Sequence, residues 1–312
     1  MFVHKSSCFY IKLCVFVSVC FINLDQAKSQ DVGSLQITYI DSASLDYSSY
    51  PTLDSSNFSG FAWRNYFLEQ VEAETAETAK EIIEKTPVSV TLQSMPRDMV
   101  QLPVTEKKEL FFSVMERISK FHNQVISLKR ERIMSISHSQ NDYEFLEKMV
   151  VEYSLERAKE RMVSRADTIR VLLTRVDCIP PSLILAQSAI ESGWGTSRFA
   201  QEGNNLFGQR VWSDEIPGMK ASGRSEAKFR LAVYPNISES VKSYLRNLNT
   251  HPFYQSLRDI RERKRIQKES ISGLDLVSEM GSYSIRGEAY IFDVKRMIEF
   301  NNLANLDEDT CI

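Results

Sequence analysis

The segment LILAQSAIE (183–191) constrains the fold more than any other, because it predicts a helix that is apolar nearly all round. Pro180 and Pro181 precede it, and a proline in the first turn of a helix loses no intrahelical hydrogen bond. Gly193 and Gly195 follow it and favour a helix end. A helix without a polar face belongs in the interior of a domain. We therefore expect this helix to be buried.

Glu191 lies in the last turn of this apolar helix. Burial raises the pKa of a carboxyl group, and the negative end of the helix dipole raises it further. A glutamic acid that keeps its proton near neutral pH can protonate the leaving oxygen of a glycosidic bond. Gln187, one turn earlier on the same face, is placed to hydrogen-bond it. The alternative interpretation is a structural pair with a buried arginine, such as Arg175 or Arg198.

The stretch AQSAIESGWGTSRFAQEGNNLFGQ (186–209) resembles the core motif of the glucosaminidase domain, glycoside hydrolase family 73, in its Bax-like bacterial subgroup. The lead-in RVD…P…SL and the exit EGNNLFGQ are shared with that subgroup, and residues 245–261 and 283–290 also match it. The resemblance extends from about Lys107 to Leu303. A contiguous motif of this length is specific.

The resemblance implies an α+β fold, a mainly helical lysozyme-like domain with a small β-hairpin lobe beside the cleft. It implies an endo-β-N-acetylglucosaminidase that cleaves the β-1,4 bond after N-acetylglucosamine in peptidoglycan glycan strands. Glu191 matches the general acid of the family. A muramidase or lytic transglycosylase on the same fold, and a catalytically dead glycan-binding protein, remain as alternatives.

The resemblance also implies substrate-binding roles for residues around Glu191. An aromatic ring can stack on a sugar, amides can bond hydroxyl or acetamido groups, and a tyrosine hydroxyl can position the acetamido group or a water. The structural alternative for the two asparagines is turn formation. The candidates are Gln187, Trp194, Asn204, Asn205, Phe207 and Tyr283.

The resemblance also implies a second acidic residue in the hairpin, which the sequence predicts between residues 209 and 234. Glu226 is our first choice, Glu215 the second, and Asp214 is a further carboxylate in the segment. Arg230 stands where members of the subgroup tend to carry an acid. The substrate's own acetamido group can replace the second carboxylate in some glycosidases, and this mechanism stays open.

Residues 1–29 read as a signal peptide, because Lys5 and Lys12 precede a mostly apolar run over residues 13–24. A buried N-terminal helix and a lipoprotein anchored through Cys20 are the alternatives. This signal peptide would direct the chain to the periplasm or cell envelope and would then be cleaved. No apolar run reaches the roughly 20 residues of a membrane span, so we expect no stable span after cleavage.

The mature chain divides at about residue 105. Residues 30–105 read as an N-terminal extension or tether, with one helix over 62–85 and a strand over 88–93. Residues 106–312 form the expected lysozyme-like domain, in which Thr105 can cap the first helix.

Charge, histidine spacing and cysteine content indicate which partners, metals and cofactors the chain is expected to bind. The 312 residues carry a net charge of −3, which argues against a strongly basic nucleic-acid surface, so no nucleic-acid partner is expected. The basic run 258–268 reads as a solvated helix face or as a surface for an anionic polymer.

The scattered histidines and the lack of paired-ligand spacing predict no metal and no cofactor. Cys178 and Cys311 would remain after signal cleavage, either as a disulfide or as two separate thiols.

Overall fold

The computed structural model describes residues 68–136, 140–160, 162–220 and 228–308. The predicted signal peptide (1–29), the candidate acid Glu226 and the cysteine Cys311 lie outside the described residues. Within them, no helix is both long enough and apolar enough to cross a membrane.

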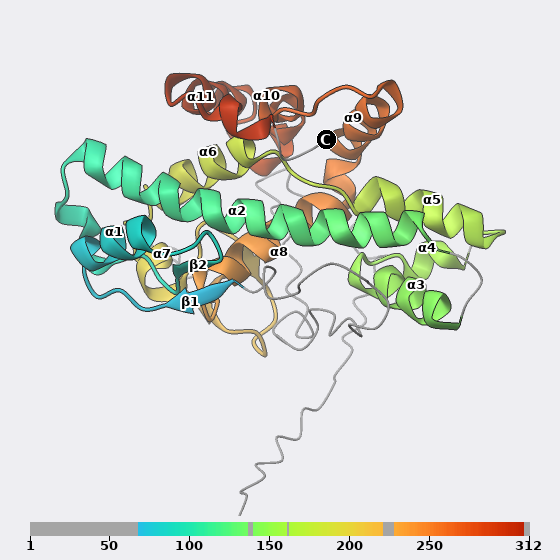
Figure 1. The fold of residues 1–312 in the computed structure, drawn as a ribbon, viewed down its shortest axis with the longest axis horizontal. Helices are drawn as coiled ribbons and strands as arrows, with labels where there is room; N and C mark the ends of the chain where they lie inside the picture. The colour runs from blue at the N-terminus through green and yellow to red at the C-terminus, as the bar shows by residue number, and fades with distance from the viewer. Residues whose placement is uncertain (1–67, 137–139, 161, 221–227, 309–312) are drawn as a thin grey trace, which may run out of the picture. The chain divides into compact units, whose positions relative to one another are not determined.

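The described chain is mainly helical, with short strands (Figure 1). Its α-helices are α1 (Ala76–Lys85), α2 (Val104–Met134), α3 (Gln140–Glu152), α4 (Glu156–Lys159), α5 (Arg165–Arg175), α6 (Pro181–Ser192), α7 (Arg198–Gly203), α8 (Ile237–Thr250), α9 (Gln255–Gln267), α10 (Gly273–Leu276) and α11 (Glu288–Phe300). Shorter 3₁₀ turns are η6 (Arg97–Gln101), η7 (Pro252–Tyr254), η8 (Val277–Tyr283) and η9 (Leu303–Asp307).

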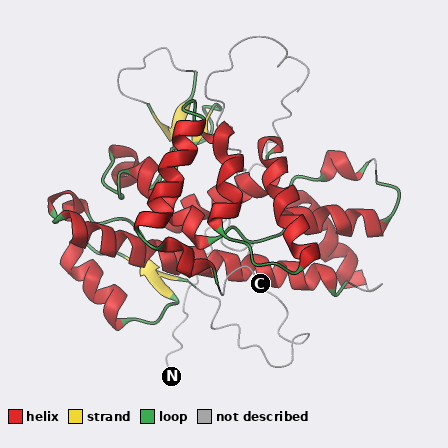
Figure 2. Cartoon of the chain, turned by 90° about the horizontal axis from the view of Figure 1, so that it is seen from above, coloured by secondary structure: helices red, strands yellow, loops and turns green. Residues whose placement is uncertain are grey.

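The strands form two small sheets, which Figure 2 shows in yellow among the helices. In the first sheet, β1 (Glu69–Val71) pairs in parallel with β2 (Val90–Leu92). In the second, β5 (Arg230–Ala232) lies between β3 (Arg210–Val211) and β4 (Gly218–Met219), antiparallel to both. A mainly helical chain with small sheets is compatible with the expected lysozyme-like α+β fold.

Helix α6 is the buried helix that the sequence predicts. It begins at Pro181, ends before Gly193, whose φ is +58°, and contacts α2, α10, α11 and η9. Every residue from Pro181 to Ala189 is buried. The helix has no capping side chain at its own start, and Asp307 replaces one: its carboxylate accepts bonds from the backbone N–H of Ser182 at 2.9 Å and from the hydroxyl of Ser182 at 2.6 Å. An acidic group at this end also favours the helix dipole.

Helix α2 is the longest described helix and contacts α1, α5, α6 and α8 (Figure 1). It buries an apolar stripe that includes Leu110, Val114 and Ile118, as the spacing predicts. The prediction that Thr105 caps it is wrong, because the cap position is Pro103 and Thr105 already lies in the first turn.

Residues 68–103, the described part of the predicted N-terminal extension, contribute to the core. Of the helix expected over 62–85, residues 62–67 lie outside the described residues, strand β1 occupies part of the rest, and α1 begins at Ala76, where Thr75 accepts a bond from the N–H of Thr78. The strand expected over 88–93 is confirmed as β2. Buried residues of this segment, Leu92 and Met95 among them, belong to the same core cluster as α2 and α6.

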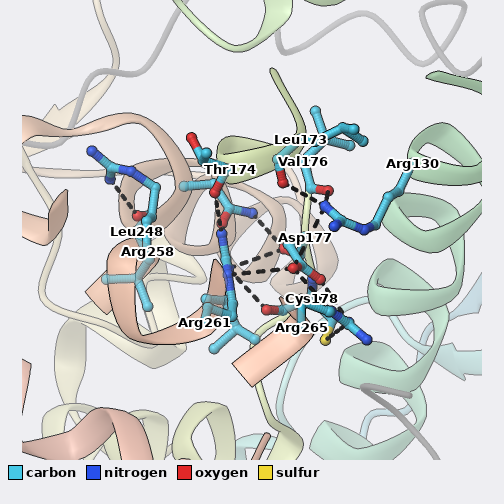
Figure 3. A network of polar contacts seen from close by, with 12 residues as sticks. Arg130, Leu173, Thr174, Val176, Asp177, Cys178, Leu248, Arg258, Arg261 and Arg265 are labelled. Carbon is cyan, nitrogen blue, oxygen red and sulfur yellow. Dashed lines mark hydrogen bonds and ion pairs between the residues drawn. The ribbon is translucent and has the colours of Figure 1, made fainter. Parts of the chain in front are cut away.

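A polar network around Asp177 joins several helices (Figure 3). The Asp177 carboxylate accepts a bond from Arg265 at 2.8 Å and lies 3.6 Å from Arg130 of α2. Arg261 of α9 is fully buried and donates to the carbonyl oxygens of Cys178 at 2.9 Å and Thr174 at 2.9 Å. These bonds hold α2, the end of α5 and α9 to the loop that leads into α6.

This network corrects the interpretation of the basic run 258–268 for two of its arginines, while Arg263 and Lys268 are exposed as a solvated face predicts. Arg258 and Arg261 are buried, and Arg258 donates to the carbonyl oxygens of Leu248 and His251. Their charges therefore serve internal hydrogen bonds instead of a solvated face. Cys178, beside the network, is bonded in a disulfide, while its expected partner is not among the described residues.

Candidate active site

Glu191 is the penultimate residue of α6, and its side chain is half-buried. The backbone of Gly208 faces it: a methyl group added at Gly208 would stand 3.4 Å from Oε2 of Glu191. Gly208 also has a φ of +64°, which glycine adopts without strain. This glycine keeps the space in front of the carboxyl group open.

Burial raises the pKa of Glu191 above its ordinary value. A hydrogen bond from the hydroxyl of Tyr290 and the positive charges of Arg210 and Arg286 oppose this rise in part. The net effect is a carboxyl group that holds its proton to higher pH than a solvated glutamate does. That is the property required of a general acid at a glycosidic bond.

The hydrogen bond from Tyr290 to Glu191 is the last of a series of hydrogen bonds between buried side chains. The hydroxyl of Tyr244 donates to Oε1 of Gln187, and Nε2 of Gln187 donates to the hydroxyl oxygen of Tyr290 at 2.8 Å. Tyr290 in turn donates to Glu191. Because the Gln187 amide donates on one side and accepts on the other, the hydroxyl proton of Tyr290 points to Glu191.

Aromatic rings pack these hydrogen-bonded side chains in place. Phe207 stacks on Tyr244 with 4.0 Å between ring centroids, and Tyr283 stacks on Tyr290 at 5.5 Å. The hydroxyl of Tyr283 donates to the carbonyl oxygen of Phe207 at 2.8 Å. Burial raises the pKa of Tyr290 well above its ordinary value, so its hydroxyl remains a donor at neutral pH.

Comparison with known proteins finds a family and a relative that the chain resembles. Residues 166–303 match the glucosaminidase family, described as mannosyl-glycoprotein endo-beta-N-acetylglucosaminidase. The chain is also 30% identical over 191 residues to Protein bax of Escherichia coli (strain K12), a match that covers 60% of this chain and 66% of that protein. Residues 166–303 form a Bax-like glucosaminidase domain. No solved structure matches the chain.

Glu191 lies at the end of a buried helix, as the sequence pattern predicts, and Tyr290 is a hydrogen-bond partner that the pattern does not predict. The side chain of Gln187 hydrogen-bonds Tyr290, which in turn donates to Glu191. The two arginines of the structural alternative are engaged elsewhere: Arg175 donates to the carbonyl oxygen of Tyr153, and Arg198 to that of Lys220.

Four candidate substrate-binding residues are buried supports of the site. Gln187 and Phe207 have no exposed surface, Asn205 has 1% and Tyr283 has 2%. Phe207 therefore has no face to offer a sugar ring, which corrects its predicted role. The side chain of Asn205 bonds the backbone of residues 207, 209 and 232, which is the turn-forming alternative.

The two remaining candidates lie closer to the surface. Asn204 adopts a left-handed conformation at the end of α7, and its amide donates to the carbonyl oxygen of Tyr234 at 3.1 Å. Trp194 packs its ring edge-on against Phe111 and Phe112 of α2, with the ammonium group of Lys108 4.8 Å from its centroid. These contacts make Trp194 part of the junction between α6 and α2.

The second acid is not located by the described residues. Glu215 is exposed, and Asp214 is exposed beside Arg230, with 3.3 Å between the charged groups. Arg230 also donates to the carbonyl oxygen of Ser213 at 2.7 Å. It therefore closes the turn between β3 and β4.

Sequence reasoning missed the roles of Tyr244, Tyr290, Gly208 and Arg210. The two tyrosines appear in the sequence only as members of apolar helix stripes. A buried tyrosine hydroxyl needs a hydrogen-bond partner, and that requirement is the signal that marks them as more than packing residues.

Proposed function

We propose that this chain is a peptidoglycan hydrolase, an endo-β-N-acetylglucosaminidase that cleaves the β-1,4 bond after N-acetylglucosamine. One observation carries the proposal: within a glucosaminidase domain, a half-buried glutamic acid of raised pKa ends an apolar helix and receives a directed hydrogen bond from Tyr290. The match to the glucosaminidase family supports a glycan substrate, and the choice of peptidoglycan rests on the resemblance of residues 186–209 to the Bax-like subgroup.

The reaction begins at Glu191. Its carboxyl group gives a proton to the glycosidic oxygen, the bond from the anomeric carbon to that oxygen breaks, and the leaving sugar departs as an alcohol. The hydrogen bond from Tyr290 stabilises the carboxylate that remains. A water molecule then adds to the anomeric carbon, and Glu191 takes back a proton.

Two mechanisms can stabilise the anomeric carbon after the leaving sugar departs and before water adds to it. The acetamido oxygen of the substrate can attack it, or a hairpin carboxylate, Glu226 or Glu215, can act as base or nucleophile. We favour the acetamido route, because Arg230 occupies the position at which related sequences tend to carry an acid.

The proposal includes export of the chain. Peptidoglycan lies outside the cytoplasmic membrane, and residues 1–29 have the charge and apolar pattern of a signal peptide. A periplasmic or cell-envelope location follows from the two together.

The test is Glu191→Gln, with products identified by mass spectrometry of digested peptidoglycan. The amide keeps the shape of the carboxyl group but cannot act as an acid, so we expect kcat to fall by about 10²–10⁴-fold with the fold intact. Glu202→Gln, at an exposed position on α7, is the matched control and should keep full activity.

The products distinguish the alternatives. Reducing-end N-acetylglucosamine supports the proposal, whereas anhydro-muramic ends would identify a lytic transglycosylase. Wild-type protein that releases no product would indicate a glycan-binding protein, and full activity of Glu191→Gln would remove Glu191 from the mechanism.

A further inference from the structure

The sheet β3–β5–β4 has two faces of different character. On one face Val211, Ala232 and Tyr234 form a small buried cluster, against which Ile216 packs. Side chains alternate between the faces of a strand, so Arg210 and Trp212 belong to the other face. Trp212 is 41% exposed there, although a large aromatic ring gains free energy from burial.

Phe229 joins Trp212 on this second face. The register pairs Val211 with Arg230, so the next opposed positions along the antiparallel strands are 212 and 229. Their ring centroids lie 6.3 Å apart with the planes tilted by 49°. The guanidinium group of Arg210 lies 4.2 Å from the centroid of Phe229. The three side chains thus form a continuous strip, which we call the aromatic strip.

Arg210 links the aromatic strip to the Glu191 site. The positive charge of Arg210 acts on the carboxyl group of Glu191, and Gly208, which faces that carboxyl group, is two residues before Arg210. Trp212 is two residues beyond Arg210, about 7 Å further along the strand direction. A strand of sugars that enters the site at Glu191 can therefore extend over the strip.

We propose that Trp212 and Phe229 form a sugar-binding subsite, on which a hexosamine ring of the glycan strand stacks at a distance from the cleaved bond. The inference rests on the proposed function and names residues that hold its substrate. The apolar face of a sugar ring complements an exposed aromatic face, while its hydroxyl groups stay in water. The positive charge of Arg210 beside the rings suits the carboxylates of an anionic glycan better than an apolar peptide.

The test measures binding in the Glu191→Gln background, which does not consume the ligand. The probes are peptide-free peptidoglycan glycan strands and chitohexaose, titrated by calorimetry. We expect Trp212→Ala and Phe229→Ala each to raise Kd by at least about 5-fold, and Trp212→Phe to restore most of the affinity. In the active protein, Trp212→Ala should raise KM on peptidoglycan and leave kcat nearly unchanged.

Phe292→Ala is the matched control. Phe292 is also an exposed aromatic residue, at 58%, and lies beneath an arginine, with Arg296 5.7 Å from its centroid, but on α11. Its Kd should equal that of the parent. Thermal melting curves of all variants establish that each is folded.

The outcomes separate the inference from the proposed function. If the parent binds glycan and both alanine variants bind it equally well, the subsite is refuted and the proposed function stands. If the parent binds neither probe and the wild-type protein releases no sugar from peptidoglycan, the proposed function fails and the subsite fails with it.

Discussion

At the scale of the residue, the protonation of Glu191 depends on where one hydroxyl proton points. Gln187 fixes that direction, because its amide group accepts from Tyr244 and donates to Tyr290. The hydroxyl of Tyr290 is left to donate to Glu191, which stabilises the charged carboxylate. Burial raises the pKa of Glu191, and this bond limits the rise.

Tyr290→Phe should therefore shift the pH dependence of kcat/KM. Without the bond the pKa of Glu191 rises further, so the acid stays protonated to higher pH and the alkaline limb of the profile moves upward. The charges of Arg210 and Arg286 remain and act on Glu191 in the variant as in the wild type. The measurement is kcat/KM on purified glycan strands across the pH range.

Tyr254→Phe provides the control for this shift. Tyr254 is a buried tyrosine near Glu191, but its hydroxyl bonds Asn247. Its removal should leave the alkaline limb in place. An unchanged limb in Tyr290→Phe as well would show that Tyr290 only packs against the site.

The sequence predicts Glu191 and its raised pKa because both follow from a local pattern, an apolar helix with one acid at its end. It does not predict Tyr290, which lies 103 residues from Gln187 and meets it only through the packing of α11 on α6. The predicted sugar-stacking role of Phe207 is wrong for the same reason. Whether its ring is exposed depends on α8, which brings Tyr244 against Phe207.

At the scale of the element, the loop after α6 is held in place by residues that precede the part of the chain matched to the glucosaminidase family, residues 166–303. Gly195 lies against Met95 and Phe111, and Gln201 donates to the carbonyl oxygen of Pro96 at 3.2 Å. The residues around β2 thus support the loop that follows Glu191. The sequence predicts the strand β2 from its alternation, but alternation does not reveal which loop it supports.

Gly195→Ala should destabilise the protein and lower its activity. The φ of Gly195 is +75°, and an added Cβ would stand 2.9 Å from Cγ of Met95, closer than atoms tolerate. Backbone strain of about 1–2 kcal/mol adds to an overpacking cost of about 1–3 kcal/mol. Urea unfolding curves measure the loss.

Gly193→Ala separates the two contributions. Gly193 also has a positive φ, +58°, but its added Cβ would meet only Oγ1 of Thr196, at an ordinary contact distance of 3.6 Å. It should lose only the strain part of the free energy of unfolding. Equal losses in the two variants would argue against the contact with Met95.

At the scale of the whole molecule, Asp177 connects helices that are distant in sequence. Burial alone would raise the pKa of Asp177, but Arg261, Arg265 and Arg130 hold it below its ordinary value. The cations around it keep their hydrogen bonds to backbone oxygens and need the carboxylate to balance their charge.

Asp177→Asn should lower the free energy of unfolding by about 3–5 kcal/mol at neutral pH, because it leaves buried arginines without a counter-charge. The stabilisation by a carboxylate of lowered pKa is complete above its ordinary value of about 3.9 and is lost as the pH falls through the lowered pKa. The difference between the variant and the wild type should therefore shrink in acid. Urea unfolding at neutral and acidic pH measures it.

Asp214→Asn removes a fully exposed carboxylate, which pairs with the half-buried Arg230, and is the control. It should change the stability little, since solvent screens such a pair. A comparable loss in the free energy of unfolding from both substitutions would mean that burial does not strengthen the ion pairs of Asp177.

The bond between Asp307 and Ser182 has a consequence for the order in which the protein is made. When Ser182 of α6 is added to the growing chain, the carboxylate that completes the first turn of this helix is still 125 residues from being synthesised. Contacts between residues so far apart form late, because the entropy of closing the intervening chain opposes them. A nascent chain therefore carries Glu191 on an unfinished helix until translation of the domain is nearly over, and its site is assembled last.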